Sequence, residues 1–142
     1  MKFEPEVWGP HYWFFLHTVA RTYPDFPNEV TKRKYYDLIQ NFPLFIPVIE
    51  IGNKFSVFLD KYPVSPYLKN RESFKRWVNF IHNKINTTIS KPEMSYFNSN
   101  EQYDRYYLPK YIRICEKLKI KKYHIFTFFI IFVISLIYFY YE

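Results

Sequence analysis

Residues 125–141, IFTFFIIFVISLIYFYY, contain no charged side chain, and this run limits the fold more than any other feature of the chain. An α-helix rises about 1.5 Å per residue, so a helix over 123–141 nearly spans the ~30 Å hydrocarbon layer of a bilayer. Tyrosines stand at both ends of this helix, where an aromatic belt meets the lipid headgroups. A buried core helix is the alternative, but it needs a larger protein around it. We therefore predict one transmembrane helix, preceded by about one domain's length of chain.

The formal net charge of +7 is concentrated next to this apolar run. Residues 110–122, KYIRICEKLKIKK, contain six Lys or Arg and one Glu. Such a segment is attracted to anionic lipid headgroups, by about 1 kcal/mol per Lys or Arg near the surface. Nucleic acid would also attract it, but a membrane flank accounts better for its position, and no nucleic-acid partner is expected. Because Lys and Arg favour the cytosolic side, we predict a C-terminally anchored, single-pass protein whose domain faces the cytosol.

The soluble part is predicted to be all-α, because no alternation typical of strands is sustained anywhere. A first helix is predicted to begin near Pro10, and the pair Tyr23-Pro24 ends it, since a residue before proline avoids the helical region. Three further helices are predicted over 29–41, 48–61 and 71–89, and the last two carry an apolar stripe at helical spacing.

The chain after these helices is predicted to be less regular. Residues 93–100 form a polar turn, and a short helix runs from about 101 towards the basic segment. The predicted organisation is a helical domain over 1–109, a basic juxtamembrane segment over 110–122 and a transmembrane helix over 123–142.

The scarcity of glycine and cysteine excludes several classes of protein. With two glycines, neither G-x-G-x-x-G nor a P-loop is present. Cys115, the one cysteine, rules out an intramolecular disulfide, a C-x-x-C pair and a cysteine-rich zinc site within this chain. Neither His17 nor His82 has a carboxylate or thiol partner at ligand spacing, so no metal is expected. No serine nucleophile or acid pair stands out, so no catalytic residue is assigned.

Side chains suited to a flat ligand share helix faces at two places. Trp13 and His17 lie on one face of the first helix, and His82, Asn83 and Asn86 project from neighbouring positions of the fourth. Imidazoles and carboxamides beside a Trp offer stacking and hydrogen bonds to an aromatic ring with polar edges. Each residue taken singly also fits a packed core, so periodicity leaves both interpretations open.

Two separated motifs carry a family resemblance. The first is WGPHYWFFLH at 8–17, and the second is WVNFIHNKIN at 77–86, followed by Lys91-Pro92. They resemble the FAD-linked sulfhydryl oxidases of the Erv/ALR family, whose second motif is W-x-C-x-x-H-N-x-V-N with a downstream K-P. The similarity covers about residues 8–96.

The resemblance implies a four-helix bundle with a short fifth helix, FAD as cofactor and, in most members, a homodimer. It also implies a set of FAD neighbours: Trp13, His17 and Tyr23 from the first helix, Trp77, His82, Asn83 and Asn86 from the fourth, and Lys91 beside the phosphates.

The family's redox-active C-x-x-C has no counterpart in this sequence. Alignment on the proline places the pair at Leu44 and Pro47, whereas alignment on the downstream KYPV places it at Val48 and Ile51. Neither alternative contains sulfur, so thiol oxidation by the family's relay is expected to be lost or to need cysteines of a partner protein.

The family's second disulfide is also missing, because Asn79 and Tyr96 stand at its positions. Cys115 lies in the basic segment, where it has three possible fates: an intermolecular disulfide, a palmitoyl chain or no role.

Three hypotheses follow. The chain is a membrane-anchored FAD-binding protein without oxidase activity of its own, or an active thiol oxidase that uses cysteines of another chain, or a cofactor-free helical scaffold or dimerisation module at a membrane. The composition, rich in Lys, Ile, Asn, Tyr and Phe, suggests an AT-rich genome, and a virion or host membrane of a large DNA virus is compatible with it.

Overall fold

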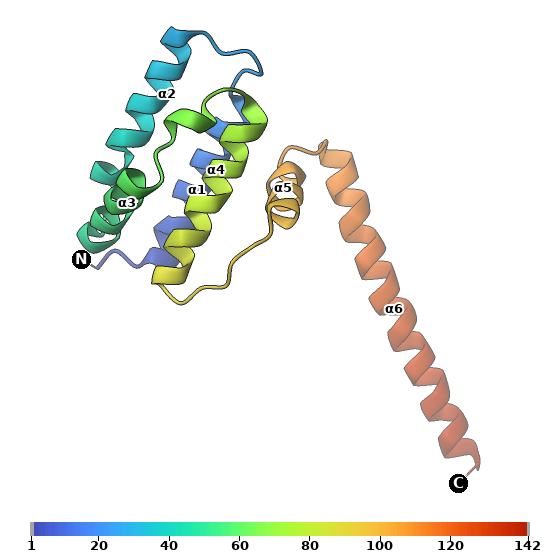
Figure 1. Cartoon of the computed structure of the whole chain (residues 1–142). Helices are drawn as coiled ribbons and strands as arrows, with labels where there is room; N and C mark the ends of the chain where they lie inside the picture. The colour runs from blue at the N-terminus through green and yellow to red at the C-terminus, as the bar shows by residue number, and fades with distance from the viewer. Residues whose placement is uncertain (1, 142) are drawn as a thin grey trace. The chain divides into compact units, whose positions relative to one another are not determined.

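The computed structural model describes residues 2–141, apart from the side chain of Ile120, and contains no strand in that range. The α-helices are α1 (Pro5–Thr22), α2 (Glu29–Asn41), α3 (Ile49–Lys61), α4 (Arg71–Thr88), α5 (Tyr96–Arg105) and α6 (Lys110–Tyr141), with short 3₁₀ helices η1 (Phe42–Phe45) and η2 (Ser65–Tyr67) (Figure 1). The chain divides into two compact units, Met1–Tyr103 and Asp104–Glu142.

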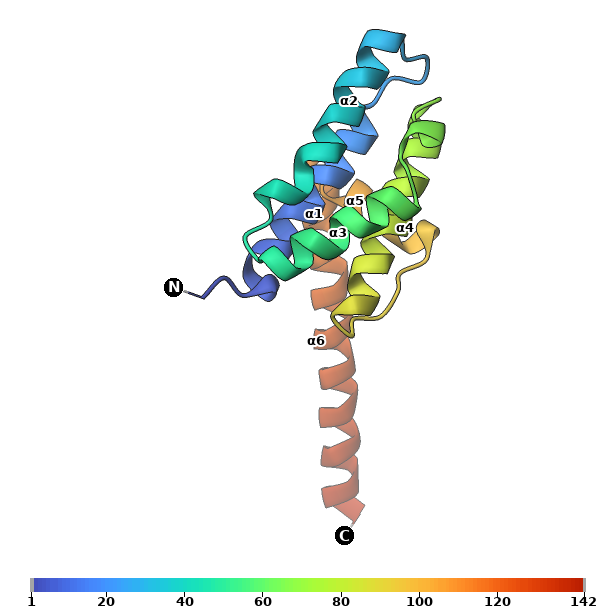
Figure 2. The ribbon, with the colours of Figure 1, turned by 60° about the vertical axis from the view of Figure 1, so that its left-hand side comes forward.

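In the first unit the apolar faces of α1 and α4 pack along each other, and α3 packs against α4 and η1 (Figures 1 and 2). Large side chains fill the space between them: Tyr23, Phe55, Phe74 and Trp77 are at most 2% exposed. The bundle and the short fifth helix predicted from the sequence are confirmed.

Helix ends in the first unit are fixed by side chains. Asn28 and Asn70 are the N-caps of α2 and α4, and each side-chain oxygen accepts a hydrogen bond of 2.8 Å from the backbone N–H three residues later. Such caps satisfy donors that a helix leaves without a partner. Arg71 then fastens the end of α1 to the start of α4, because its Nε donates to the Tyr23 carbonyl at 2.6 Å.

The expected start of the first helix was wrong. The helix begins at Pro5, where a missing N–H has no cost, and Pro10 lies inside it. Pro10 removes one hydrogen bond, the one to the Glu6 carbonyl, and the helix continues through it. The predicted end before Tyr23 and the helix over 29–41 are confirmed.

The polar turn expected over 93–100 was also wrong. A helix already begins at Tyr96, and it buries only Ser99 and Tyr103, one turn apart. The residues that hold this helix lie on other helices, so its own sequence carries little signal.

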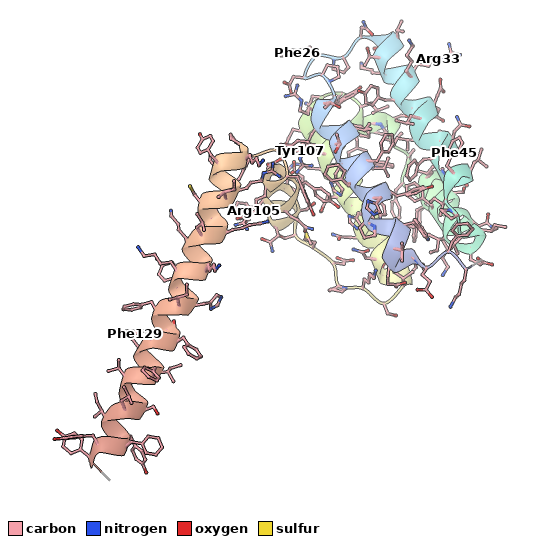
Figure 3. All side chains as sticks on the ribbon, turned by 180° about the vertical axis from the view of Figure 1, so that it is seen from behind. Phe26, Arg33, Phe45, Arg105, Tyr107 and Phe129 are labelled. Carbon is pink, nitrogen blue, oxygen red and sulfur yellow. The ribbon has the colours of Figure 1, made fainter. Side chains whose placement is uncertain are left out.

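The second unit contains α6, a single helix of 32 residues. The basic segment and the apolar run belong to this one helix, which is long and apolar enough to cross a membrane. Its apolar side chains are exposed, as Phe129 illustrates (Figure 3).

Candidate functional site

A cavity of about 310 Å³ opens among the helices of the first unit, at the low end of the range for small-molecule sites. Its walls come from the first turns of α1, from α3, from the second half of α4 and the segment after it, and from α5. Most of the lining is apolar or aromatic, with Trp8 and Trp13 from α1. Gly9 also lines it, and a Cβ there would meet no atom within 4 Å.

Two histidines from different helices meet beside this cavity. The His82 ring stacks on Trp13, with centroids 4.0 Å apart and planes 12° from parallel. His17 Nε2 lies 3.2 Å from His82 Nδ1, and these two atoms share a hydrogen bond. His82 lines the cavity, whereas His17 is 2% exposed behind it.

Both imidazoles are neutral at pH 7. Burial, with smaller contributions from the charges of His82 and Arg21, lowers the pKa of His17 to about 2. Burial lowers the pKa of His82 to about 4, with a smaller contribution from the Lys91 ammonium. A neutral imidazole has one donor and one acceptor nitrogen, so His82 keeps a nitrogen for a ligand while the other bonds His17.

Polar side chains also line the cavity. Asn86 lines it with a carboxamide, and Lys91 follows on the segment after α4. The Lys91 ammonium lies 3.9 Å from a Glu6 carboxylate oxygen, with both side chains substantially exposed. A pair so exposed is weak, so an anionic group can take the place of Glu6.

Four residues that the resemblance implies as FAD neighbours do not line the cavity. His17 underlies it, and Asn83 binds the Met94 backbone in both directions, at 2.8 and 2.9 Å. Tyr23 and Trp77 lie in the core, where they donate to the carbonyls of Leu68 and Tyr62, respectively. Trp13, His82, Asn86 and Lys91 do line it.

The sequence interpretation missed Tyr103, which lines the cavity from α5. Its ring stacks on His17 at 3.9 Å and 15°. Tyr103 lies beyond both motifs and inside a segment without an apolar stripe, so no local signal marks it.

The structure also bears on where the missing dithiol would lie. Val48 is the N-cap of α3, and Ile51, in the first turn, lines the cavity. Leu44 and Pro47 do not line it, and Leu44 is 79% exposed. This geometry favours the alignment on Val48 and Ile51.

Comparison with known proteins agrees with these motifs. The Erv1/Alr family model matches residues 10–106. The chain belongs to the Erv1/Alr family. A relative from Acanthamoeba polyphaga mimivirus, named as a probable FAD-linked sulfhydryl oxidase, is 32% identical over 107 residues, which are 75% of this chain and 75% of the relative. The FAD-linked sulfhydryl oxidase of African swine fever virus is 30% identical and covers 69% of this chain and 81% of its own.

Solved structures show the same fold. The FAD-binding domain of Erv1 from Saccharomyces cerevisiae superposes with a TM-score of 0.66 at 24% identity, covering 72% of this chain and 95% of that domain. The four-helix architecture predicted from the sequence is therefore that of the Erv1/Alr family.

The residues of the cavity fit the ring and phosphate chemistry of FAD. Aromatic walls suit a flat heterocycle, the His82 imidazole and the Asn86 carboxamide suit its polar edges, and Lys91 suits a phosphate. No group of three or more His, Cys, Asp or Glu that could hold a metal occurs in the described part of the chain.

Proposed function

We propose that this chain binds FAD in the cavity between α1, α3, α4 and α5, and that it has no dithiol relay of its own. The observation that carries the proposal is the joint placement of Trp13, His82, Asn86 and Lys91 around one cavity. Trp13 and His82 bind and orient the ring system, Asn86 hydrogen-bonds its edge, and Lys91 balances phosphate charge. His17, Tyr23, Trp77 and Asn83 support these residues from behind or beside the cavity.

Bound FAD would supply two-electron redox chemistry, with a dithiol as the donor and O₂ as the acceptor. The overall reaction of such an oxidase converts two thiols and O₂ into a disulfide and H₂O₂. In this chain the first turn of α3 presents Ile51 to the cavity where the relay would need a thiol. We therefore propose that the isolated chain does not oxidise dithiols by this route, and that a partner protein supplies the cysteines.

Restoring the dithiol tests this proposal. The double variant Val48→Cys, Ile51→Cys should consume O₂ with a dithiol substrate and form H₂O₂, whereas the parent should not. Leu44→Cys, Pro47→Cys is the matched control, since neither position lines the cavity, and it should stay inactive. Turnover by the parent that survives Cys115→Ser would contradict the proposal.

Anchoring at a membrane is the second part of the proposal. Nineteen residues over 123–141 give about 28 Å of helix, close to the ~30 Å of a bilayer core. The Lys and Arg of 110–122 precede them, which supports an anchor with the domain on the cytosolic side of a virion or host membrane. Extraction of the full chain from membranes by alkaline carbonate, without detergent, would contradict it.

The proposed organisation keeps the helical domain over 1–109, the basic segment over 110–122 and the transmembrane helix over 123–142. A homodimer is also part of the proposal. Exposed phenylalanines support it: Phe15, together with Phe26 and Phe45, which Figure 3 labels. Light scattering in detergent should give twice the mass of one chain.

A cofactor-free scaffold is the alternative function. Its support is that Tyr23 and Trp77 already satisfy their polar atoms in the core, as residues retained for packing would.

A further inference from the structure

We propose that Tyr103 contacts the cofactor and that Arg21 is the residue that positions it. This inference rests on the proposed function, because it takes FAD as the occupant of the cavity. Neither residue belongs to the two motifs that relate the chain to its family.

Tyr103 is built into the same set of rings as the residues already placed at the cavity. Trp13 stacks on His82, His82 bonds His17, and His17 stacks on Tyr103. The two ends of this set, Trp13 and Tyr103, both line the cavity. Aromatic walls at two places on one cavity suit a ligand with an extended π system.

The neighbouring rings hold the Tyr103 side chain in one position at the edge of the cavity. Its side chain is 7% exposed, and the ring against which it stacks, His17, is buried and neutral. A ring held in this way loses little further freedom when a ligand packs on it.

Arg21 places Tyr103 by holding α5 on α1. Its Nη2 donates to the backbone carbonyl of Asn100 at 3.0 Å and to the Asn100 side-chain oxygen at 3.3 Å. Its guanidinium carbon lies 5.3 Å from the centroid of the Tyr103 ring, within cation–π range. Its Nη1 donates a hydrogen bond to the backbone carbonyl oxygen of His17 at 3.4 Å. One side chain thus joins the helix that carries His17 to the helix that carries Tyr103.

This contact matters because α5 has little stability of its own. It has ten residues and a polar sequence, and isolated helices of that length are marginal in water. The position of Tyr103 therefore depends on the hydrogen bonds of Arg21. The planar guanidinium makes these bonds at the same time, which a lysine ammonium cannot do in this geometry.

The test measures FAD affinity of the full chain in non-ionic detergent, after removal of bound flavin and titration with FAD. Tyr103→Leu keeps apolar volume but has no π face, and should raise the Kd for FAD about 5- to 100-fold, as loss of a base–aromatic stack does. Tyr103→Phe should restore the affinity to within about twofold. Phe97→Leu, at an exposed aromatic of the same helix, is the matched control and should change nothing.

Fluorescence of the bound flavin distinguishes direct contact between Tyr103 and the cofactor from a purely structural role of Tyr103. Tyr103→Leu should raise this fluorescence, since an aromatic ring in contact quenches it, and Tyr103→Phe should restore the quenching. Arg21→Lys keeps the charge but loses the planar fork of donors, so it should weaken FAD binding and raise the fluorescence of the bound flavin. Phe97→Leu should change neither.

The outcomes distinguish this inference from the proposed function. A parent chain that binds no FAD overturns the proposed function. A parent that binds FAD, with a Tyr103→Leu variant that binds it equally well or more tightly, overturns the role of Tyr103 alone. If Tyr103→Leu does not fold, Arg21→Lys decides: unchanged affinity and fluorescence overturn the inference.

Discussion

The buried histidine pair makes the stability of this protein depend on pH in a defined direction. Above pH 6.5, the usual pKa of His in an unfolded chain, His17 and His82 are neutral in both states and contribute no pH dependence. Below pH 6.5, both histidines become protonated in the unfolded chain but stay neutral in the folded chain, because their folded pKa values are about 2 for His17 and about 4 for His82. Stability is therefore lost as the pH falls from 6.5, and the loss continues until the folded groups are protonated.

The size of the effect follows from these values. Between pH 7 and pH 5 the unfolded state gains about 2 kcal/mol from each histidine, so the pair lowers the free energy of unfolding by about 4 kcal/mol. Urea unfolding of the full chain in non-ionic detergent, followed by circular dichroism at pH 7, 6 and 5, measures this difference.

Variants assign the effect to these two residues. His82→Asn should remove about half of the difference, and the double change with His17→Asn should remove most of it. His11→Asn, at an exposed histidine of α1, is the control and should leave it unchanged. A free energy of unfolding that is equal at pH 7 and pH 5, or a difference that persists in the double variant, would refute the reasoning.

Two further predictions concern packing around the site. Gly52→Ala should destabilise the protein by about 1–3 kcal/mol, because its Cβ would lie 2.8 Å from the backbone carbonyl oxygen of Pro43, whereas Gly9→Ala, with no atom within 4 Å, should stabilise α1 by about 0.5–1 kcal/mol. Thermal unfolding of the two variants compares them directly, and equal shifts would contradict this prediction. Asn83→Ala should lower stability by about 1–2 kcal/mol and increase hydrogen exchange at the Met94 amide, because both hydrogen bonds to Met94 are lost. Weaker FAD binding with unchanged Met94 exchange would instead indicate direct contact between Asn83 and the cofactor.

The sequence predicts the bundle well where an apolar stripe ends at a proline or begins at a cap. The helix over 29–41 lies between Asn28 and Pro43 and is found at those limits. The fourth helix was predicted to within a residue because Phe74, Trp77 and Ile81 repeat on one face, and all three are buried.

The limits of the fifth helix could not be predicted from local sequence patterns. Its contacts are tertiary: Arg21 holds Asn100, and the Tyr96 hydroxyl donates to Glu72 at 2.9 Å. A stripe of two buried residues is too short to give a periodic signal. Tyr103 was missed as a site residue for the same reason.

Polar contacts hold the α4–α5 connection at the two positions where the family resemblance leads one to expect cysteines. The Tyr96 ring centroid lies 4.3 Å from the Arg76 guanidinium carbon, and the Tyr96 hydroxyl donates to Glu72. The Asn79 side chain lies within 3.5 Å of the Met94 carbonyl. Polar and cation–π contacts thus hold this connection to α4.

The visible absorption spectrum of the full chain, purified in non-ionic detergent without added cofactor, tests the central claim most directly. We expect the spectrum of a flavin at close to one FAD per chain. A colourless protein that retains its helical circular dichroism and takes up no FAD on titration would contradict it, and the scaffold alternative would then describe the protein better.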